Sequence, residues 1–329
     1  MIDIEVARKI IRNTLNPLIS NFKDIALFDF PNYSNVGDSA IWLGTMDYLK
    51  ENASSFPIIW MSDIKSLSAK NPPVFDKKTL LIINGGGNFG DLWVSHQRHR
   101  ELLIHNYPNN RIIQLPQSIH FQSGLNLEST KNLIAKHKDF HFIVRDKKSF
   151  EIAKTFEGTK AYLCPDMAFY IKRIPKLKKP KHDVVALIRT DKESVISEDY
   201  GKYKMPSFDW ISEPKTVAVR IDLFMGHYPS IIGRYPLLNK FFRLFIYKRL
   251  AEERFRRGCD LLMQGKVVIT DRLHAHIMCT LLGIPNIVLD NSYGKIKNIL
   301  TTWEGDSEIT VQAEFFSEAA ARANLYLRR

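Results

Sequence analysis

The sequence predicts an α/β protein in which mostly parallel sheets carry helices on both faces. Short apolar runs alternate along the chain with stretches of helical periodicity, which is the order of strands and helices in a parallel sheet. A Lys- and Pro-rich stretch at 172–183 interrupts this alternation and divides the chain. The length of 329 residues also suits two domains of about 100–200 residues each. We therefore expect two α/β units joined at this stretch.

The first unit is expected to span residues 1–175 and to alternate helices with buried strands. Apolar residues at helical spacing indicate helices over 3–23, 40–51, 93–105, 126–138 and 147–155. Short apolar runs indicate strands over 25–30, 57–61, 79–84, 111–115, 140–146 and 161–166. Asp38 or Ser39 is expected to cap the helix that begins at Ala40.

The second unit is expected to span residues 183–311, followed by a closing helix over 312–329. Its clear strands are expected over 184–189, 266–270 and 286–290. The segment 216–224 fits either a strand or the start of a buried helix. The segment 237–262 mixes aromatic with basic residues, which favours a core-packed helix with a solvated basic face over a helix lying on an anionic membrane surface.

The composition narrows the class of protein. A formal net charge of +12 favours anionic partners, but no nucleic-acid-binding motif is present, so no nucleic-acid partner is expected. The three cysteines form no C-x-x-C pair, which argues against a disulfide framework and against a metal site. The N-terminus does not resemble a signal peptide, and no long apolar run suggests a membrane span. We expect a cytoplasmic protein.

A glycine-rich segment, INGGGNFGD at 83–91, follows one of the expected strands. Gly85 to Gly90 fit the G-x-G-x-x-G spacing of dinucleotide-binding loops, but the next strand, RIIQLPQ, ends without the acidic residue that would bind a ribose. The segment is therefore weak support for a dinucleotide cofactor. Consecutive glycines leave backbone N–H groups open to an anion or to a closely approaching ligand. A tight turn from strand to loop is the alternative interpretation.

Polar residues follow three further expected strands. They are Asn35 and Asp38 in FPNYSNVGDSA, His120 in QLPQSIHF, and Arg145 in FHFIVRD. Ligands of open α/β sheets bind at the carboxyl ends of the strands, where these residues are expected to lie. The structural alternatives are a helix-capping role for Asp38, packing of His120, and an ion pair or capping arrangement of Arg145 with Asp146.

The segment KVVITDRLHAHIMCTLLGIPNIVLD (266–290) predicts a strand, a helix and a second strand. The expected helix boundaries are a cap at Thr270 or Asp271 and a stop at Gly283. Arg272 and His274 then lie in the first helical turn, where bare N–H groups and the helix dipole favour an anion. A guanidinium can bind a carboxylate or phosphate through paired hydrogen bonds, and an imidazole exchanges a proton near neutral pH. His276 is expected to pack in the interior.

With these motifs the sequence resembles the polysaccharide pyruvyl transferase family, and within it the bacterial exopolysaccharide and biofilm enzymes. The motifs that carry the resemblance occur in family order: NVGDSAI (35–41), INGGGNFGD (83–91), LPQSIHF (115–121), VRDKKSFE (144–151), PDMAF (165–169) and TDRLHAHIMCTLLGIP (270–285). Each motif alone is modest, and the ordered set is specific. The segment at about 190–260 matches none of the family's motifs.

The resemblance implies a glycosyltransferase-B-like fold, in which two Rossmann-like domains face each other across a cleft. It implies phosphoenolpyruvate as donor, a sugar diol as acceptor and a cyclic pyruvate ketal as product, with neither a metal nor a further cofactor. The implied donor-binding residues are Arg145, Arg272, His120 and Leu273. The implied acceptor-binding residues are Asn35, Gly85, Gly86, Gly87 and Asn88. For catalysis, His274 is expected to act as general acid and Asp38 as general base.

Two other functions stay open at the level of sequence. A glycosyltransferase of the same architecture would bind a nucleotide sugar, with Asp290 as the acid that holds the ribose. A non-catalytic member would bind sugar within a polysaccharide synthesis complex. The acceptor of a pyruvyl transferase could be a nucleotide sugar, a lipid-linked repeat or a polymer, and a lipid-linked one would favour peripheral contact with the inner face of the plasma membrane.

Overall fold

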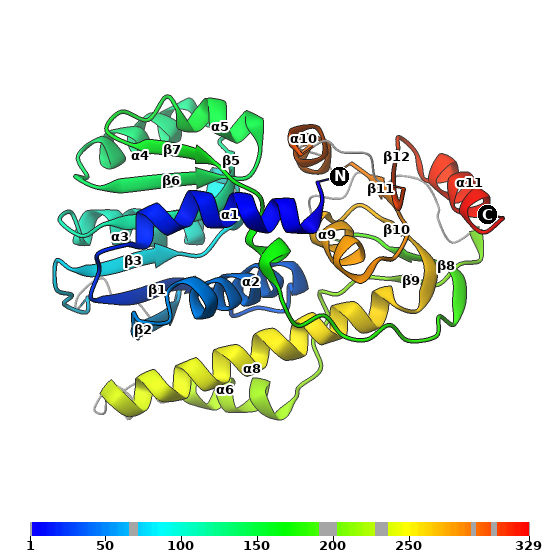
Figure 1. The fold of residues 1–329 in the computed structure, drawn as a ribbon, viewed down its shortest axis with the longest axis horizontal. Coiled ribbons are helices and arrows are strands. Elements are labelled where there is room, and N and C mark those ends of the chain that lie inside the picture. Colours follow the sequence, from blue (N-terminus) through cyan, green and yellow to red (C-terminus); the bar gives the residue numbers. More distant parts are fainter. Residues whose placement is uncertain are drawn as a thin grey trace.

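The computed structural model describes residues 2–65, 72–190, 203–227, 236–290, 294–303 and 308–328. It shows two sheets side by side, each flanked by helices (Figure 1). The N-terminal sheet has the strand order β2-β1-β3-β5-β6-β7, with β4 paired to β5, and the C-terminal sheet has the order β12-β11-β10-β8-β9. Every described strand pair is parallel, so the predicted α/β class is confirmed.

The N-terminal half contains each helix and strand that the sequence predicts, with shifted ends. Its strands are β1 (Asp24–Phe30), β2 (Ile58–Asp63), β3 (Thr79–Ile83), β4 (Gly86–Gly90), β5 (Ile112–His120), β6 (Phe140–Val144) and β7 (Lys160–Leu163). Its helices are α1 (Ile4–Ile19), α2 (Val36–Asn52), α3 (Val94–Asn106), α4 (Gly124–Ala135) and α5 (Lys147–Ala153), with single 3₁₀ turns η1 (Asp91–Trp93) and η2 (Met167–Tyr170).

The C-terminal half also follows the predicted pattern, with three additional elements, two strands and a helix. Its strands are β8 (His182–Leu187), β9 (Ser207–Phe208), β10 (Gly265–Thr270), β11 (Asn286–Leu289) and β12 (Thr310–Ala313). Its helices are α6 (Val217–His227), α8 (Pro236–Leu262), α9 (Leu273–Leu282), α10 (Lys295–Thr302) and α11 (Phe316–Tyr326). The ambiguous segment 216–224 is therefore helical, and a strand precedes the closing helix, which begins at Phe316 instead of at 312.

The glycine-rich segment is not the loop that the sequence predicts. Its residues form β4, which pairs with the extended end of β5. At Gly90, where φ is 123°, an added Cβ would lie 1.7 Å from the carbonyl oxygen of His120, so no other residue fits this pairing. Helix α2 likewise begins at Val36, earlier than predicted, because the side chain of Asn35 accepts a hydrogen bond from the Gly37 N–H and caps the helix there.

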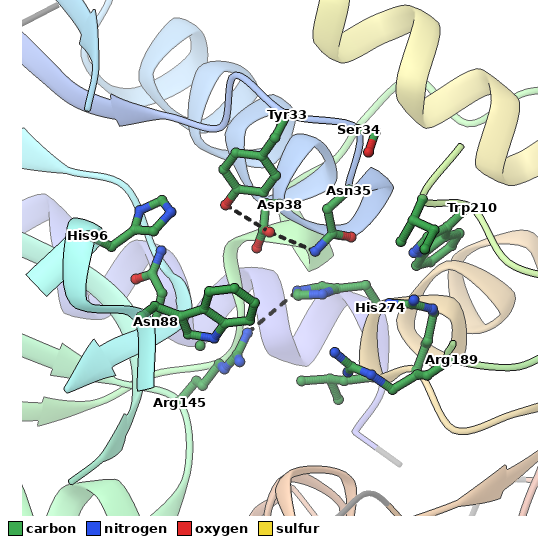
Figure 2. A pocket seen from close by; sticks show the side chains of 15 residues that line it. Tyr33, Ser34, Asn35, Asp38, Asn88, His96, Arg145, Arg189, Trp210 and His274 are labelled. Atoms are coloured by element: carbon green, nitrogen blue, oxygen red, sulfur yellow. Dashed lines mark hydrogen bonds between the residues drawn. The ribbon is translucent and has the colours of Figure 1, made fainter. Parts of the chain in front are cut away.

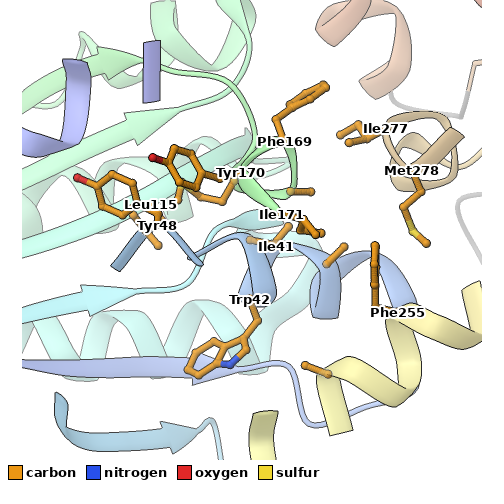
Figure 3. Close-up of a cluster of buried hydrophobic side chains, with 14 of the residues drawn as sticks. Ile41, Trp42, Tyr48, Leu115, Phe169, Tyr170, Ile171, Phe255, Ile277 and Met278 are labelled. Carbon is orange, nitrogen blue, oxygen red and sulfur yellow. The ribbon is translucent and has the colours of Figure 1, made fainter. Parts of the chain in front are cut away.

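An apolar core connects the two halves. Figure 3 shows Trp42 of α2, Phe255 of α8 and Met278 of α9 within one cluster of buried side chains. An added Cβ at Gly258 of α8 would lie 2.4 Å from Val36, which shows how closely α8 and α2 approach. The shared core fixes the N-terminal ends of α2 and α9 near each other, and the loops before them follow β1 and β10.

Helix α8 begins beneath the N-terminal sheet, alongside α6, and runs to the C-terminal sheet (Figure 1). The ring of Tyr247 stacks on Phe30 at a centroid distance of 3.9 Å, and Ile246, Leu250 and Phe255 are buried. The helix is thus packed into the core, as the sequence favours. Among the described residues, no helix combines the length and apolarity needed to cross a membrane.

Candidate functional site

A cavity of about 440 Å³ lies between the two halves, which is within the size range of small-molecule sites. Its lining residues follow the carboxyl ends of β1, β6, β8, β9 and β10, or lie within β4 and just after it. Parallel sheets bind ligands at these ends because the loops there are free to vary while the strands hold them in place. Figure 2 shows side chains from both halves converging on this space.

The cavity collects most of the residues that the sequence singled out. Those that line it are Asn35, Asp38, Gly87, Asn88, Arg145, Arg272, Leu273 and His274. Gly85 and Gly86 are not among the lining residues. They lie buried beneath it, where an added Cβ at Gly85 would be 2.6 Å from the Pro116 carbonyl oxygen.

His120 does not line this cavity either. Because β5 continues through His120 instead of ending near Leu115, the side chain lies with Ser118, Asp146 and Lys148 around a separate, smaller hollow. The structure therefore separates His120 from the other residues for which the resemblance implies donor binding.

Arg145 is held rigidly at the floor of the cavity. Its Nη1 lies 2.6 Å from Oδ2 of Asp166, and its Nε donates to Ser118 Oγ at 2.9 Å. The Arg145 side chain is only 2% exposed, which rules out the alternative of a surface ion pair. Trp303 also donates its indole N–H to the Arg145 carbonyl oxygen. The guanidinium is thus fixed before any ligand arrives.

His274 completes a buried cluster with Arg145 and Asp166. Its Nε2 lies 3.4 Å from Asp166 Oδ2 and 3.5 Å from Arg145 Nη1. Burial opposes ionisation of Asp166, but the hydrogen bond and charge of His274 and the charge of Arg145 outweigh it and hold the pKa of that carboxyl below its usual value. An ionised Asp166 can stabilise the protonated form of His274, as a carboxylate does in a catalytic His–Asp pair.

Arg272 occupies the position just before α9. Its Nη2 lies 2.7 Å from Asp209 Oδ1, and its guanidinium carbon lies 5.7 Å from the centre of the Trp210 ring. No side chain caps α9, whose N-cap position is Arg272 instead of the predicted Thr270 or Asp271. The N–H groups of the first turn are therefore available to an anion in the cavity.

The predicted cap residues have other roles. Thr270 accepts a hydrogen bond from the Arg272 N–H through its hydroxyl, and Asp271 accepts one from the Arg189 N–H. Burial raises the pKa of Asp271 to about 6. His276 is fully buried and bonds to Asn286 at 2.7 Å, and Gly283 ends α9 with φ at 69°, both as predicted.

The opposite wall is built by the loop after β1 and by the end of β4. Asp38 Oδ2 accepts hydrogen bonds from the Tyr33 hydroxyl at 3.0 Å and from Asn35 Nδ2 at 2.8 Å (Figure 2). Since Asn35 caps α2, Asp38 is not needed as the cap and presents its carboxylate to the cavity. Asn88 lies beside it, with its Oδ1 taken by Arg100 at 2.9 Å and by Gln117 at 2.7 Å.

This geometry can be set against known proteins. Residues 35–293 match the sequence profile of the polysaccharide pyruvyl transferase family. The chain belongs to this family. It is 31% identical over 293 residues to the putative pyruvyl transferase EpsO of Bacillus subtilis, covering 87% of each chain. It is also 31% identical over 309 residues to pyruvyl transferase 1 of Schizosaccharomyces pombe, covering 86% of this chain and 70% of the relative.

The fold has a counterpart among solved structures. A functionally uncharacterised protein of Klebsiella pneumoniae aligns with a TM-score of 0.55 at 20% identity, covering 95% of this chain and 99% of that one. At this identity the likeness concerns the fold alone. Family membership makes the chain a pyruvyl transferase with a role in polysaccharide synthesis.

Several lining residues of this pyruvyl transferase were not singled out by sequence reasoning. They are Tyr33, Ser34, Trp93, His96, Arg189, Trp210 and Ile211, with Asp166 and Asp209 directly behind the wall. Arg189 could have been found, since it follows an apolar strand as Arg145 does. The aromatic residues carry no such signal. In the part of the chain that the structure describes, no group of three His, Cys, Asp or Glu side chains is placed to hold a metal ion.

Replacing Asp166 by Asn is expected to destabilise this pyruvyl transferase by about 3–5 kcal/mol at neutral pH, because Arg145 would keep a buried charge without its carboxylate. The lowered pKa of Asp166 means that its contribution is complete above the unfolded-state value of about 3.9 and shrinks as the pH falls below it. The test measures the melting temperatures of the parent chain and of Asp166→Asn between pH 3 and 7, in steps of about one pH unit.

The matched control is Glu128→Gln, which removes an exposed pair with Lys131 and should change stability by less than about 1 kcal/mol. Equal melting curves for Asp166→Asn and the parent chain at pH 7 would show that the Arg145–Asp166 pair does not hold the site together.

Proposed function

We propose that this chain transfers the pyruvyl group of phosphoenolpyruvate to two hydroxyls of one sugar, forming a cyclic ketal and releasing phosphate during exopolysaccharide synthesis. The observation that carries the proposal is that Arg145, Arg189 and Arg272 line one cavity together with His274. Phosphoenolpyruvate bears a carboxylate and a phosphate, whose charges sum to about −3 near neutral pH. A cationic cavity with an acid–base group suits this donor.

The donor is expected to lie between the arginines and the N-terminus of α9. Ser118 and Asp166 occupy only part of the five N–H donors of Arg145, so further N–H groups of this guanidinium remain for the ligand. Leu273 lines the cavity at the first turn of α9, whose dipole favours the phosphate. The buried indole N–H of Trp210 has no hydrogen-bond partner among the described residues, which suits it to donate to the same anion.

The proposed chemistry begins at His274. A proton from His274 to the methylene carbon, C3, makes C2 electrophilic, and Asp166 stabilises the imidazolium that delivers it. The first sugar hydroxyl then forms a bond to C2 and loses its proton to Asp38. Departure of phosphate, with the electron pair of its C2–O bond, lets the second hydroxyl close the ring.

The acceptor is expected to bind on the opposite wall, against Asn35, Asp38, Gly87 and Asn88. Because Oδ1 of Asn88 already accepts two hydrogen bonds, its Nδ2 is the atom left to donate to a sugar hydroxyl. The arrangement of the two parallel sheets suits two Rossmann-like domains of glycosyltransferase-B type, divided near 175–183. A lipid-linked acceptor would bring the protein to the membrane surface or to a polysaccharide synthesis complex.

No observation favours a nucleotide-sugar donor. Asp290, the acid expected to hold a ribose in that case, accepts hydrogen bonds from the N–H groups of Ile296 and Lys297 at the start of α10. It is not among the residues that line the cavity. Phosphoenolpyruvate and UDP-glucose can be compared by thermal shift, each alone, and we expect phosphoenolpyruvate to stabilise the chain. Stabilisation by UDP-glucose with none by phosphoenolpyruvate would favour the nucleotide-sugar donor.

The activity test is phosphate release from phosphoenolpyruvate across a panel of UDP-sugars and p-nitrophenyl glycosides with adjacent free hydroxyls. We expect release with at least one member, and the product should gain the mass of a pyruvyl ketal. Binding of phosphoenolpyruvate without release for every member would instead favour a non-catalytic sugar-binding protein.

Replacing Arg272 by Lys is expected to weaken phosphoenolpyruvate binding about 10- to 100-fold, because an ammonium cannot form the paired hydrogen bonds of a guanidinium. Isothermal calorimetry of both chains with phosphoenolpyruvate measures the change. The control is Arg322→Lys on α11. The exposed side chain of Arg322 pairs with Glu318 and does not line the cavity. An unchanged dissociation constant for Arg272→Lys would remove Arg272 from the donor site.

A further inference from the structure

The wall of the cavity that faces the acceptor contains a second His–Asp pair. His96, in the first turn of α3, lines the cavity, and its Nδ1 lies 3.0 Å from Oδ1 of Asp29. Figure 2 shows His96 beside Tyr33 and Asn88, on the side away from Arg189 and Trp210. The pair joins residues far apart in sequence, and the chemistry assigned above to His274 and Asp38 does not use it.

Ketal formation requires more than one proton acceptor. Each of the two sugar hydroxyls forms a bond to C2 and loses its proton, whereas Asp38 accounts for only the first. One of the two protons replaces the proton that His274 gives to C3, and the other leaves with phosphate. A second base near the acceptor would therefore serve the ring-closing step, and His96 is the histidine on that wall.

We propose that His96 is a catalytic residue that accepts the proton of the second sugar hydroxyl, and that Asp29 positions it. The inference rests on the proposed pyruvyl transfer and assigns the base of its last step. In that step the C2–O bond to phosphate breaks with its electron pair on phosphate, the second hydroxyl oxygen bonds to C2, and its proton passes to Nε2 of His96. No oxidation or reduction is involved.

The hydrogen bond to Asp29 determines the tautomer of the His96 imidazole and affects its pKa. Since a carboxylate faces Nδ1, the neutral ring holds its proton there, and the lone pair resides on Nε2. Burial lowers the pKa of His96, but the hydrogen bond and charge of Asp29 outweigh it and raise the pKa above its ordinary value. A base with a raised pKa binds the transferred proton more strongly.

The backbone at Asp29 is strained in a way that serves this pair. Asp29 is 3% exposed and has φ at 63°, in the left-handed region, at the point where the β1–β2 register shifts. Residues other than glycine adopt this conformation at a cost, and such strain gathers at functional sites. This conformation places the buried carboxylate of Asp29 behind His96. The charge and hydrogen bond of His96, with the charge of Arg100, whose Nη2 lies 3.9 Å from Asp29 Oδ2, lower the pKa of Asp29 against the effect of burial.

The same wall has the shape of a sugar site. Trp93, which directly precedes α3, lines the cavity and is 36% exposed, so its apolar surface can cover a face of the sugar ring. Nδ2 of Asn88 is turned to the ligand by the bonds that its Oδ1 accepts. An acceptor held between Trp93 and Asn88 would lie next to His96.

The test compares His96→Ala with the parent chain on the panel sugar that gives the fastest phosphate release. We expect phosphate release to fall about 10²–10³-fold, with the dissociation constant for phosphoenolpyruvate unchanged and activity partly restored by added imidazole. His105→Ala, an exposed histidine on the same helix, should behave as the parent chain does.

The role of Asp29 is separated from a merely structural one by the pH profile. Asp29→Asn removes the carboxylate that raises the pKa of His96, so the acidic limb of kcat/KM for the acceptor should move to lower pH. The other groups that face His96 are Tyr33, Asp38, His99 and Arg100, and all are unchanged in this variant. A structural role alone would lower activity without moving the limb.

Two results would contradict the inference, and they are distinguishable. If the parent chain releases phosphate and His96→Ala does so at the same rate, or if imidazole restores nothing to an impaired, folded variant, His96 is not the base and the pyruvyl transfer stands. If the parent chain releases no phosphate with any sugar of the panel, the proposed function fails and the assignment of His96 fails with it.

Discussion

Replacing His274 by Ala is expected to lower kcat for phosphate release about 10²–10⁴-fold, the usual worth of a positioned general acid. The donor is bound mainly by guanidinium groups, so the dissociation constant for phosphoenolpyruvate should change little. Asp166 keeps its bond to Arg145 in the variant, and the fold should therefore survive. A phosphate-release assay measures kcat, and calorimetry on the same preparation measures the dissociation constant for phosphoenolpyruvate.

The surface residue His182 provides the control, since His182→Ala removes an exposed imidazole at the start of β8. A second variant, His274→Gln, keeps most of the side-chain volume and should be as inactive as the alanine variant. Activity of His274→Gln near that of the parent chain would mean that the side chain fills space and does not deliver the proton.

Replacing Gly37 by Ala is expected to lower the activity sharply although every proposed catalytic side chain is kept. The added Cβ would lie 2.4 Å from Nδ1 and 2.7 Å from Cβ of His274, so the imidazole has to move. A shift of a catalytic group by about 1 Å can cost about 10²-fold in rate, and we expect a loss of that size in kcat. The helix itself should not suffer, because Ala is a better helix former than Gly by up to about 1 kcal/mol.

The matched control is Gly124→Ala at the start of α4, where an added Cβ meets no atom within 4 Å. Both variants exchange a glycine for alanine in the first turn of a helix, and only one of them contacts His274. If Gly37→Ala retains the full rate, the close approach of α2 to His274 does not set the position of the imidazole.

Sequence patterns placed Arg145, Arg272 and His274 at the same edge of the strands, and all three line the cavity, because local rules position them. Arg145 and Arg272 each follow an apolar strand, and the N-cap and glycine stop of α9 place His274 in its first turn. These are boundary signals that a strand–helix alternation makes visible. Arg189 also follows an apolar strand, although it was not predicted as a site residue, and its side chain lines the cavity.

The remainder of the site depends on contacts between distant segments. The Asp29–His96 pair and the Arg145–Asp166 pair join residues on different elements, and no spacing rule links them. His120 was placed with the donor by resemblance, but the length of β5, set by its pairing with β4, carries it to another hollow. The glycine-rich segment forms a strand that pairs closely with β5 at Gly90, where an added Cβ would meet the His120 carbonyl oxygen.

The most direct test of the account is a crystal structure of the chain with phosphoenolpyruvate bound. We expect the carboxylate and phosphate within hydrogen-bonding distance of Arg145 and Arg272, with C3 facing the imidazole ring of His274. Phosphoenolpyruvate bound outside this cavity, or inside it with these guanidinium groups turned toward different spaces, would contradict the account.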